Sequence, residues 1–283
     1  MTQRYSLETL EFQTIRDRLT GLLETPLGRT GIEALRPFPD AASANRSLQQ
    51  VAELAERLAA DPRLPLPSLH DIRGWLPGFF KGDYLPSISD LVDLKRLLGA
   101  TVACRGWLTT GARFQALTEL ATGFPEVREV AEQLGAVLDE TGEIRSTASP
   151  KLAEIRKEIE AAELNVRREV QRFLSDERVY KYLQNPEPSW RNGRPVFQVR
   201  RESQGQVPGV LHDRSSSGAT IFIEPQIVVP AANALAEARS AEHREIQVIL
   251  AHVCRGLRRY DAEILDAVRA IVELDVTVAK ARL

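Results

Sequence analysis

The sequence lacks most of the residues and patterns on which metal, disulfide and cofactor chemistry depend. It has two cysteines in 283 residues, Cys104 and Cys254, with no C-x-x-C pair and only four histidines. This spacing is typical of buried free thiols in a reducing compartment, so we expect neither a disulfide nor a metal site. Neither G-x-x-x-x-G-K-[ST] nor G-x-G-x-x-G occurs. We therefore expect no bound nucleotide and no cofactor in this chain.

Long apolar runs and an excess of one charge are also missing. No stretch approaches the roughly 18 apolar residues of a membrane span. The start, MTQRYSLETLEF, has no apolar signal-peptide core. We expect a cytoplasmic protein with no membrane partner. The formal net charge is −2, so a nucleic-acid site would have to be a local patch.

Helical periodicity dominates what is present. Hydrophobic residues make up 43% and charged residues 27% of the chain, which is typical of a soluble globular protein. Apolar residues three to five apart predict a helical block over residues 1–148. A Glu-Thr-Gly turn between two short apolar pieces predicts a small hairpin near residues 137–146. The predicted fold class is mainly α with a small β module.

A long amphipathic helix is predicted over residues 149–185. Ser149 is a candidate N-cap, and Pro150 suits the first helical position. The apolar residues follow the alternating three and four spacing of a coiled-coil seam: Leu152, Ile155, Ile159, Ala162, Val166, Val170 and Phe173. Helical periodicity returns over residues 226–283. Because each apolar seam needs a partner, we expect the two helices to pair antiparallel as a lever.

Between these helices, residues 186–225 predict a small β module at the tip of the lever. The two prolines of NPEPSW are expected to stop the preceding helix. RPVFQVRRE alternates as a strand does, and QVPGVLHD and ATIFIEP are short and rich in β-branched residues. Turn dipeptides separate these runs, and Gly193, Gly209 and Gly218 are expected to shape the loops.

The stretch VLHDRSSSGATIFIEP, residues 210–225, contains the residue types of a hydrolytic site without their arrangement. A nucleophile elbow needs G-x-S-x-G, but Arg214 and Ser215 precede Ser216. His212 and Asp213 are neighbours in a predicted strand, so they should point to opposite faces. We predict no catalytic residues here, and expect His212 and Asp213 to fix the strands instead.

Arginines are concentrated in the predicted β module. A local surplus of arginine beside backbone amides and hydroxyls suits phosphate oxygens. On charge alone a second interpretation stays open, in which the arginines pair with Glu202, Asp213 and Glu224 and merely solvate a short sheet. The predicted nucleic-acid-binding residues are Arg191, Asn192, Arg194, Arg200, Arg201, Arg214, Ser215 and Ser217.

The segment RNGRPVFQVRRESQGQVPGVLHDRSSSGATIFIEP resembles the second bacterial MutS paralogue, a MutS-like family outside mismatch repair. LEFQTIRDRL, TPLGRTGIEAL, LPLPSLHDIR, DETGEIRSTASPKLAEIRKEI and ELDVTVAKARL resemble that family in the same order. Pro195 stands where that family usually has an aromatic residue. Arg200 stands where the family usually has a lysine, so the positive charge is kept. The tripeptide at residues 124–126, Phe-Pro-Glu, matches the wedge of mismatch-reading relatives. It lies between core helices with no α/β domain around it, so we interpret it as chance and expect no mismatch recognition.

The resemblance implies a MutS-type core over 1–148, an outgoing lever helix over 149–185, a clamp over 186–225 and a returning lever helix over 226–283. In that family an ATPase domain that binds ATP and Mg follows, and then a small MutS-related endonuclease domain. The chain would then be an N-terminal piece that is not itself an enzyme. The family is associated with suppressing homologous recombination by binding branched DNA, and with sensing and splitting collided ribosomes.

Two functions follow as expectations. In the first, the clamp and lever of a full-length homodimer grip duplex or branched DNA through its backbone. In the second, the clamp docks on the ribosome or its RNA, and DNA binding resides in C-terminal domains outside this chain.

Overall fold

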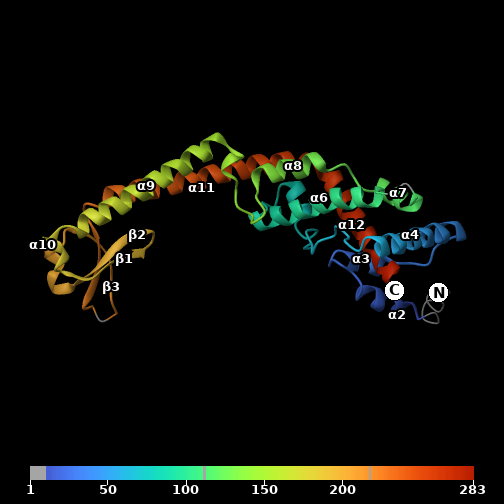
Figure 1. Ribbon diagram of the computed structural model, residues 1–283, viewed down its shortest axis with the longest axis horizontal. Helices are drawn as coiled ribbons and strands as arrows, with labels where there is room; N and C mark the ends of the chain where they lie inside the picture. The colour runs from blue at the N-terminus through green and yellow to red at the C-terminus, as the bar shows by residue number, and fades with distance from the viewer. Residues whose placement is uncertain (1–10, 111–112, 217) are drawn as a thin grey trace. The chain divides into compact units, whose positions relative to one another are not determined.

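The protein is described here by a computed structural model that places residues 11–110, 113–216 and 218–283 (Figure 1). The predicted fold class is confirmed, because the chain is mainly α-helical with one small antiparallel sheet. It forms two compact units, Met1–Arg145 with His252–Leu283, and Ser146–Ala251. In the described part of the chain, no helix has the length and apolarity needed to cross a membrane.

The first unit is a packed set of helices. They are α2 (Phe12–Thr20), α3 (Gly28–Ala34), α4 (Ala41–Ala60), α5 (Leu76–Lys81), α6 (Ile88–Thr109), α7 (Gln115–Thr122), α8 (Arg128–Val137) and α12 (Asp261–Arg282). Two of them, α6 and α12, contribute the most buried residues, and α12 contacts α2, α3, α4 and α6. Ser87 and Asp90 begin α6 with a capping box, in which each side chain accepts from the other's backbone amide. After α8, an antiparallel bridge joins Leu138 to Ile144.

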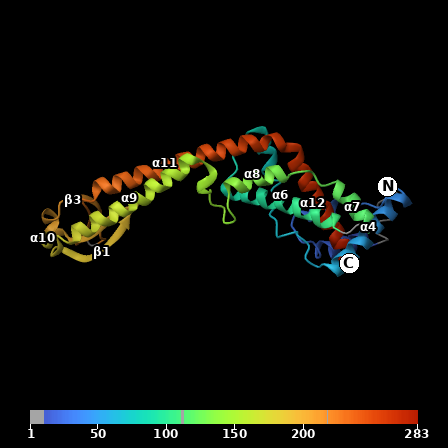
Figure 2. The same cartoon turned by 45° about the horizontal axis from the view of Figure 1, so that its top comes forward.

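Two long helices form most of the second unit, α9 (Pro150–Leu174) and the part of α11 (Val229–Leu257) up to Ala251. The Ser149 hydroxyl accepts from the amide of Leu152 at 2.9 Å, which confirms the predicted cap. The helices run side by side in Figures 1 and 2. Three ion pairs join them: Lys151–Glu245 at 2.9 Å, Arg156–Glu242 at 2.8 Å and Arg239–Glu163 at 3.0 Å. These pairs confirm the antiparallel arrangement, because the residue numbers of the α11 partners fall as those of the α9 residues rise.

The outgoing helix is shorter than the sequence predicted. It ends at Leu174 rather than 185, and a single turn, α10 (Glu177–Tyr180), follows it. The Asp176 carboxylate accepts from the backbone amide of Arg178 at 3.0 Å and is paired with its guanidinium. A short polar side chain that bonds the nearby backbone in this way competes with continuation of a helix. The helix therefore stops before it reaches the prolines.

Four strands form the β module, Leu183–Pro225: β1 (Leu183–Arg191), β2 (Arg194–Arg200), β3 (Gly209–Arg214) and β4 (Thr220–Pro225). A 3₁₀ segment, η2 (Arg201–Gln206), follows β2. The spatial order is β1-β2-β4-β3, with every pair antiparallel. Pro186 and Pro188 lie inside β1 rather than ahead of the first strand. They are tolerated because β1 is an edge strand whose register shifts between Asn185 and Ser189.

The returning helix is also divided, although the sequence predicted one continuous element. After α11 ends at Leu257, one 3₁₀ turn, η3 (Arg258–Tyr260), leads into α12. The Arg258 guanidinium donates to the backbone carbonyl of Phe79 at 2.9 Å and lies 5.1 Å from the centre of its ring. This contact fixes the turn against α5.

Candidate nucleic-acid interface

One face of the sheet is fixed by apolar packing on the helices of its unit. Phe197, Val199, Ile221 and Ile223 are buried in a core that also takes in residues of α9 and α11. The rings of Phe173 and Phe197 are 4.9 Å apart at an angle of 46°, a geometry that aromatic pairs favour. Because side chains alternate along a strand, the intervening residues of β2 and β4 point away from the helices.

A buried carboxylate holds the opposite face together. The Glu224 side chain is only 2% exposed, and one of its oxygens lies 3.1 Å from an Arg194 guanidinium nitrogen. Its other oxygen lies 2.6 Å from His212 Nε2. A buried carboxylate needs such partners, because an unpaired charge is costly to remove from water. Arg194, a predicted phosphate contact, is therefore committed to the interior of the sheet.

The prediction that His212 and Asp213 point to opposite faces is wrong. The β3–β4 register shifts between Leu211 and Asp213, which places Asp213 opposite Phe222 while His212 reaches Glu224. Phe222 and Glu224 are two residues apart on β4, so they share a face, and His212 and Asp213 share it with them. The cause is a bulge, which interrupts strict alternation.

Arg191 is also partly engaged. Its guanidinium lies 4.7 Å from the centre of the Phe222 ring and 3.9 Å from an Asp213 oxygen. Its side chain nevertheless stays nearly half exposed. A stacked guanidinium keeps its in-plane hydrogen-bond donors available, so this contact orients Arg191 without using up its donors.

Three other predicted arginines gather at one end of the sheet, around residues 219–221. Arg200 lies opposite Thr220, and the amide of Arg201 donates to the carbonyl of Ala219 at 3.0 Å. Arg214 lies opposite Ile221 on the other side of β4. All three are exposed, and within the described residues no carboxylate oxygen lies within 4.0 Å of their guanidinium nitrogens. We call Arg200, Arg201 and Arg214 the arginine rim.

The neutral residues of the prediction divide among turns. Asn192 is exposed, and with Gly193 it forms a turn in which both have positive φ, 51° and 74°, the geometry of a tight hairpin. Ser215 lies beside the arginine rim, where its amide donates to the carbonyl of Thr220 at 2.9 Å. Ser217 falls outside the described residues.

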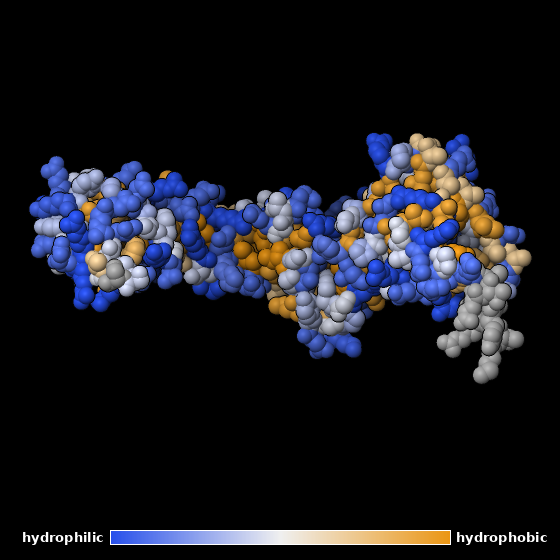
Figure 3. All heavy atoms as spheres, turned by 90° about the horizontal axis from the view of Figure 1, so that it is seen from below, coloured by the Kyte–Doolittle hydropathy of each residue, from blue (hydrophilic) through white to orange (hydrophobic). Residues whose placement is uncertain are grey.

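The predicted glycines are needed for two different reasons. A Cβ on Gly209 would lie 2.2 Å from the carbonyl oxygen of Glu224, so the strand pairing leaves no room for a side chain. Gly218 has a φ of 69°, which only glycine adopts readily. On the face seen in Figure 3, the surface at the end of the second unit that carries the β module is mostly hydrophilic.

No family model matches the sequence, but it aligns with named proteins over nearly its whole length. It is 31% identical over 278 residues to Endonuclease MutS2 of Symbiobacterium thermophilum, which covers 98% of this chain and 35% of that protein. Endonuclease MutS2 of Leuconostoc mesenteroides is 32% identical over 285 residues, with 98% and 35% covered. The chain is a relative of the MutS2 endonucleases.

The resemblance to the second bacterial MutS paralogue is thereby confirmed. A third relative, Endonuclease MutS2 of Geobacillus thermodenitrificans, is 31% identical over 284 residues, which cover 99% of this chain and 36% of that protein. The chain thus spans about a third of the length of these MutS2 relatives. The three relatives are named endonucleases, and that name describes them at their full length.

Sequence reasoning did not separate the free arginines from the committed ones. The pairing of Arg194 with Glu224 was one of the two interpretations that charge left open, and the bulge at His212 had no signal in the sequence. In the part of the chain that the structure describes, no group of three His, Cys, Asp or Glu side chains is arranged to hold a metal ion.

Proposed function

We propose that the β module binds the sugar–phosphate backbone of duplex or branched DNA, without reading base sequence or mismatches. The observation that supports this most directly is the arginine rim, in which three exposed guanidinium groups, with no carboxylate of the described residues within 4.0 Å, lie around the start of β4. Arginine presents a planar fork of donors that matches two phosphate oxygens at once. The name endonuclease, given to the MutS2 relatives, is compatible with a module that grips a nucleic-acid backbone.

The arrangement of the rim favours backbone over base contacts. Its arginines are held at strand ends by main-chain pairing, so the positions of their Cα atoms are fixed while their side chains stay solvated. Phosphate contacts of this kind set position and affinity, whereas sequence is read by groups that enter a groove. Glu224, near the other end of β4, pairs with Arg194 and so takes that arginine out of the binding surface.

For the full-length protein we propose the wider role that the resemblance implies. A homodimer, in which an ATPase domain binds ATP and Mg outside this chain, would close two such modules on DNA and so restrain homologous recombination. The paired helices α9 and α11 would carry the state of the ATPase to the β module.

Binding of this chain to DNA tests the proposal. Anisotropy of a labelled duplex and of a labelled four-way junction is measured from low salt to about 200 mM. Three phosphate contacts predict that log K falls with log salt with a slope of about −2.7. Arg200→Glu, Arg201→Glu and Arg214→Glu together should abolish binding.

The matched control reverses three exposed charges on the helices of the same unit, with Lys157→Glu, Arg168→Glu and Arg244→Glu. It should leave most of the affinity and the salt slope intact. Equal losses in both triple variants, or no binding of the original chain at low salt, would overturn the proposal.

A second candidate is docking on the ribosome or its RNA. The chain's overall charge of −2 favours this candidate. A surface with only a few free arginines would bind nucleic acid weakly alone, but it could add contacts to a larger interface with the ribosome. Ribosome co-sedimentation of the same two triple variants distinguishes the candidates. Loss of ribosome binding in the rim variant, with no DNA binding in the original chain, would support this second function.

A further inference from the structure

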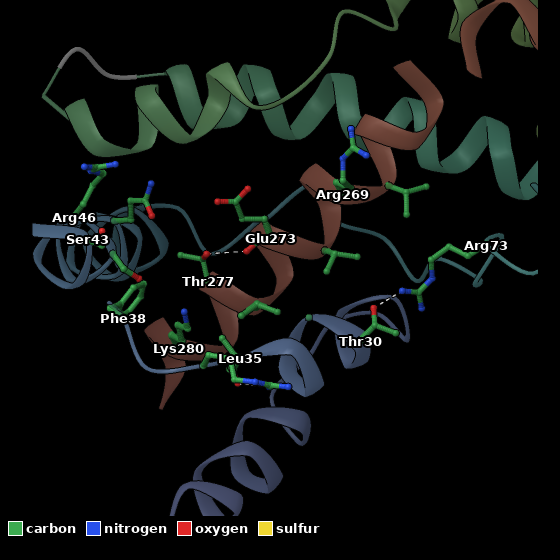
Figure 4. Close-up of a pocket in the computed structure, with 17 residues that line it drawn as sticks. Thr30, Leu35, Phe38, Ser43, Arg46, Arg73, Arg269, Glu273, Thr277 and Lys280 are labelled. Atoms are coloured by element: carbon green, nitrogen blue, oxygen red, sulfur yellow. Dashed lines mark hydrogen bonds between the residues drawn. The ribbon is translucent and has the colours of Figure 1, made fainter. Parts of the chain in front are cut away.

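The first unit contains a hollow of about 640 Å³ lined by residues of α3, α4 and α12 and the segments beside them (Figure 4). One wall is apolar, formed by Leu35, Val268, Val272 and Val276. Small-molecule sites typically enclose about 300–1,000 Å³. The hollow therefore has the size of a ligand pocket.

Its charged lining is unbalanced. One acid, Glu273, lines it together with five cationic side chains: Arg36, Arg46, Arg73, Arg269 and Lys280. Three of the cations are occupied, since Arg36 donates to two backbone carbonyls, Arg73 pairs with Asp71 and Arg269 pairs with Asp266.

The other two cations, Arg46 and Lys280, have no such partner. Within the described part of the chain, neither has a carboxylate oxygen within 4.0 Å. Burial lowers the pKa of the Lys280 amine, and the charge of Glu273 offsets this only in part. The amine lies 5.8 Å from the centre of the Phe38 ring, beside which Figure 4 shows it.

The α4 side of the hollow adds neutral donors. The Ser47 hydroxyl and the side-chain amide of Gln50 line it, and neither group has a hydrogen-bond partner among the described residues. Glu273 is placed away from Lys280 in Figure 4, on the other side of Thr277. The hollow thus has a cationic end with free donors, an apolar wall, and an acid that disfavours a second negative group.

We propose that this hollow binds a small amphipathic anion, with an aliphatic or aromatic body and one carboxylate, sulfonate or phosphate group. The anionic group would lie against Lys280 and the free donors of α4, and the body against Leu35, Val272 and Val276. Such a ligand would place an anion in direct contact with the partly buried amine, which no carboxylate of the described residues contacts within 4.0 Å, and it would cover exposed apolar surface. The proposal is independent of nucleic-acid binding by the β module.

Titration with anilinonaphthalene sulfonate, an aromatic body with a single negative group, tests the site. We expect one molecule bound per chain, followed by fluorescence and calorimetry. Lys280→Gln should weaken binding at least about tenfold, because it removes a charge-assisted hydrogen bond. Lys81→Gln, an exposed lysine on α5 outside the hollow, should leave the affinity unchanged.

A second pair of variants tests the location without changing charge. Ser47→Phe should fill the mouth of the hollow and abolish binding, whereas Asn45→Phe, at an exposed position of the same helix outside the lining, should not. Dodecanoate should displace the dye and dodecanol should not, since only the first has an anionic group. Binding at several equal weak sites, or full affinity in both Lys280→Gln and Ser47→Phe, would overturn the proposal.

Discussion

Thr25 donates two hydrogen bonds to the carboxylate of Asp275, 250 residues further along the chain. Its backbone amide lies 3.0 Å and its hydroxyl 2.6 Å from Asp275 Oδ2. The amide of Glu24 donates to the other oxygen at 2.8 Å. One buried acid on α12 thus fixes the turn that leads into α3.

Replacing this acid should destabilise the first unit. Asp275→Ala leaves three buried or partly buried donors without an acceptor, and should lower the free energy of unfolding by about 2–4 kcal/mol. Asp266→Ala, which removes a surface pair on the same helix, should cost less than about 1 kcal/mol. Urea unfolding of both variants measures the difference, and equal costs would contradict the role of Asp275.

The same acid predicts a pH dependence. Burial raises the pKa of Asp275 above its usual 3.8, although the hydrogen bonds from Thr25 and Glu24 oppose this. A carboxyl group whose folded pKa is raised binds its proton more tightly in the folded state, so its contribution is largest below pH 3.8 and is lost as the pH rises through the folded pKa. The stability difference between the original chain and Asp275→Ala should therefore shrink from pH 3.5 to pH 7. A difference that grows with pH would contradict the direction of the shift.

Gly28 should not tolerate a side chain, because α3 begins against the same acid. A Cβ there would lie 2.6 Å from Asp275 Oδ2 and 2.5 Å from a methyl group of Leu23. Gly28→Ala should lower the free energy of unfolding by about 1–3 kcal/mol. Gly99→Ala is the matched control, since a Cβ on this exposed residue of α6 meets nothing within 4 Å. Gly99→Ala should raise the free energy of unfolding by up to about 1 kcal/mol. If it lowered stability as much as Gly28→Ala does, the close contacts at Gly28 would not be the cause.

Glu224 should carry much of the stability of the β module. Glu224→Ala leaves Arg194 and His212 without their common partner, and should cost about 1–3 kcal/mol because both remain partly hydrated. Glu202→Ala, which removes an exposed acid from η2, should change stability by less than about 0.5 kcal/mol. Hydrogen exchange of β2 and β4 amides localises the effect. Unchanged exchange in Glu224→Ala would show that the cluster is dispensable.

Neither cysteine should react in the folded protein. Burial raises the pKa of the Cys104 thiol to about 12 and also raises the pKa of Cys254. The thiolate is the reactive form, so little of it is present at pH 8. Ellman's reagent should modify both thiols in urea and neither in buffer. Cys104→Ala and Cys254→Ala assign any thiol that does react rapidly.

The features that could be predicted from the sequence are those that neighbouring residues determine. Ser149 and Pro150 mark the start of α9 because a cap and a first-turn proline act within a few residues. The end of that helix was missed because the Asp176 side chain competes locally with the helix, which apolar periodicity does not reveal. The strand with two prolines was missed for another reason, since whether a strand lies at a sheet edge depends on the whole sheet.

The residues of the candidate site could be predicted from the sequence, but which arginines pair with carboxylates could not. The arginines of the β module were identified from the sequence, yet their division into committed and free groups depends on a one-residue bulge beside His212. The hollow beside Lys280 had no sequence signal, because its lining comes from segments about 230 residues apart along the chain.

The ion pairs between α9 and α11 restrict how these helices can slide past one another. Arg239, Glu242 and Glu245 are spaced three residues apart on α11, so a slip of one turn changes every partner. In one direction Glu242 would meet Glu163, and in the other Arg239 would meet Arg156. Single ion pairs near the surface are weak, but either slip exchanges three attractive pairs for one attractive pair and one pair of like charges. The three ion pairs therefore favour one register of α9 against α11 and oppose a slip of one turn in either direction.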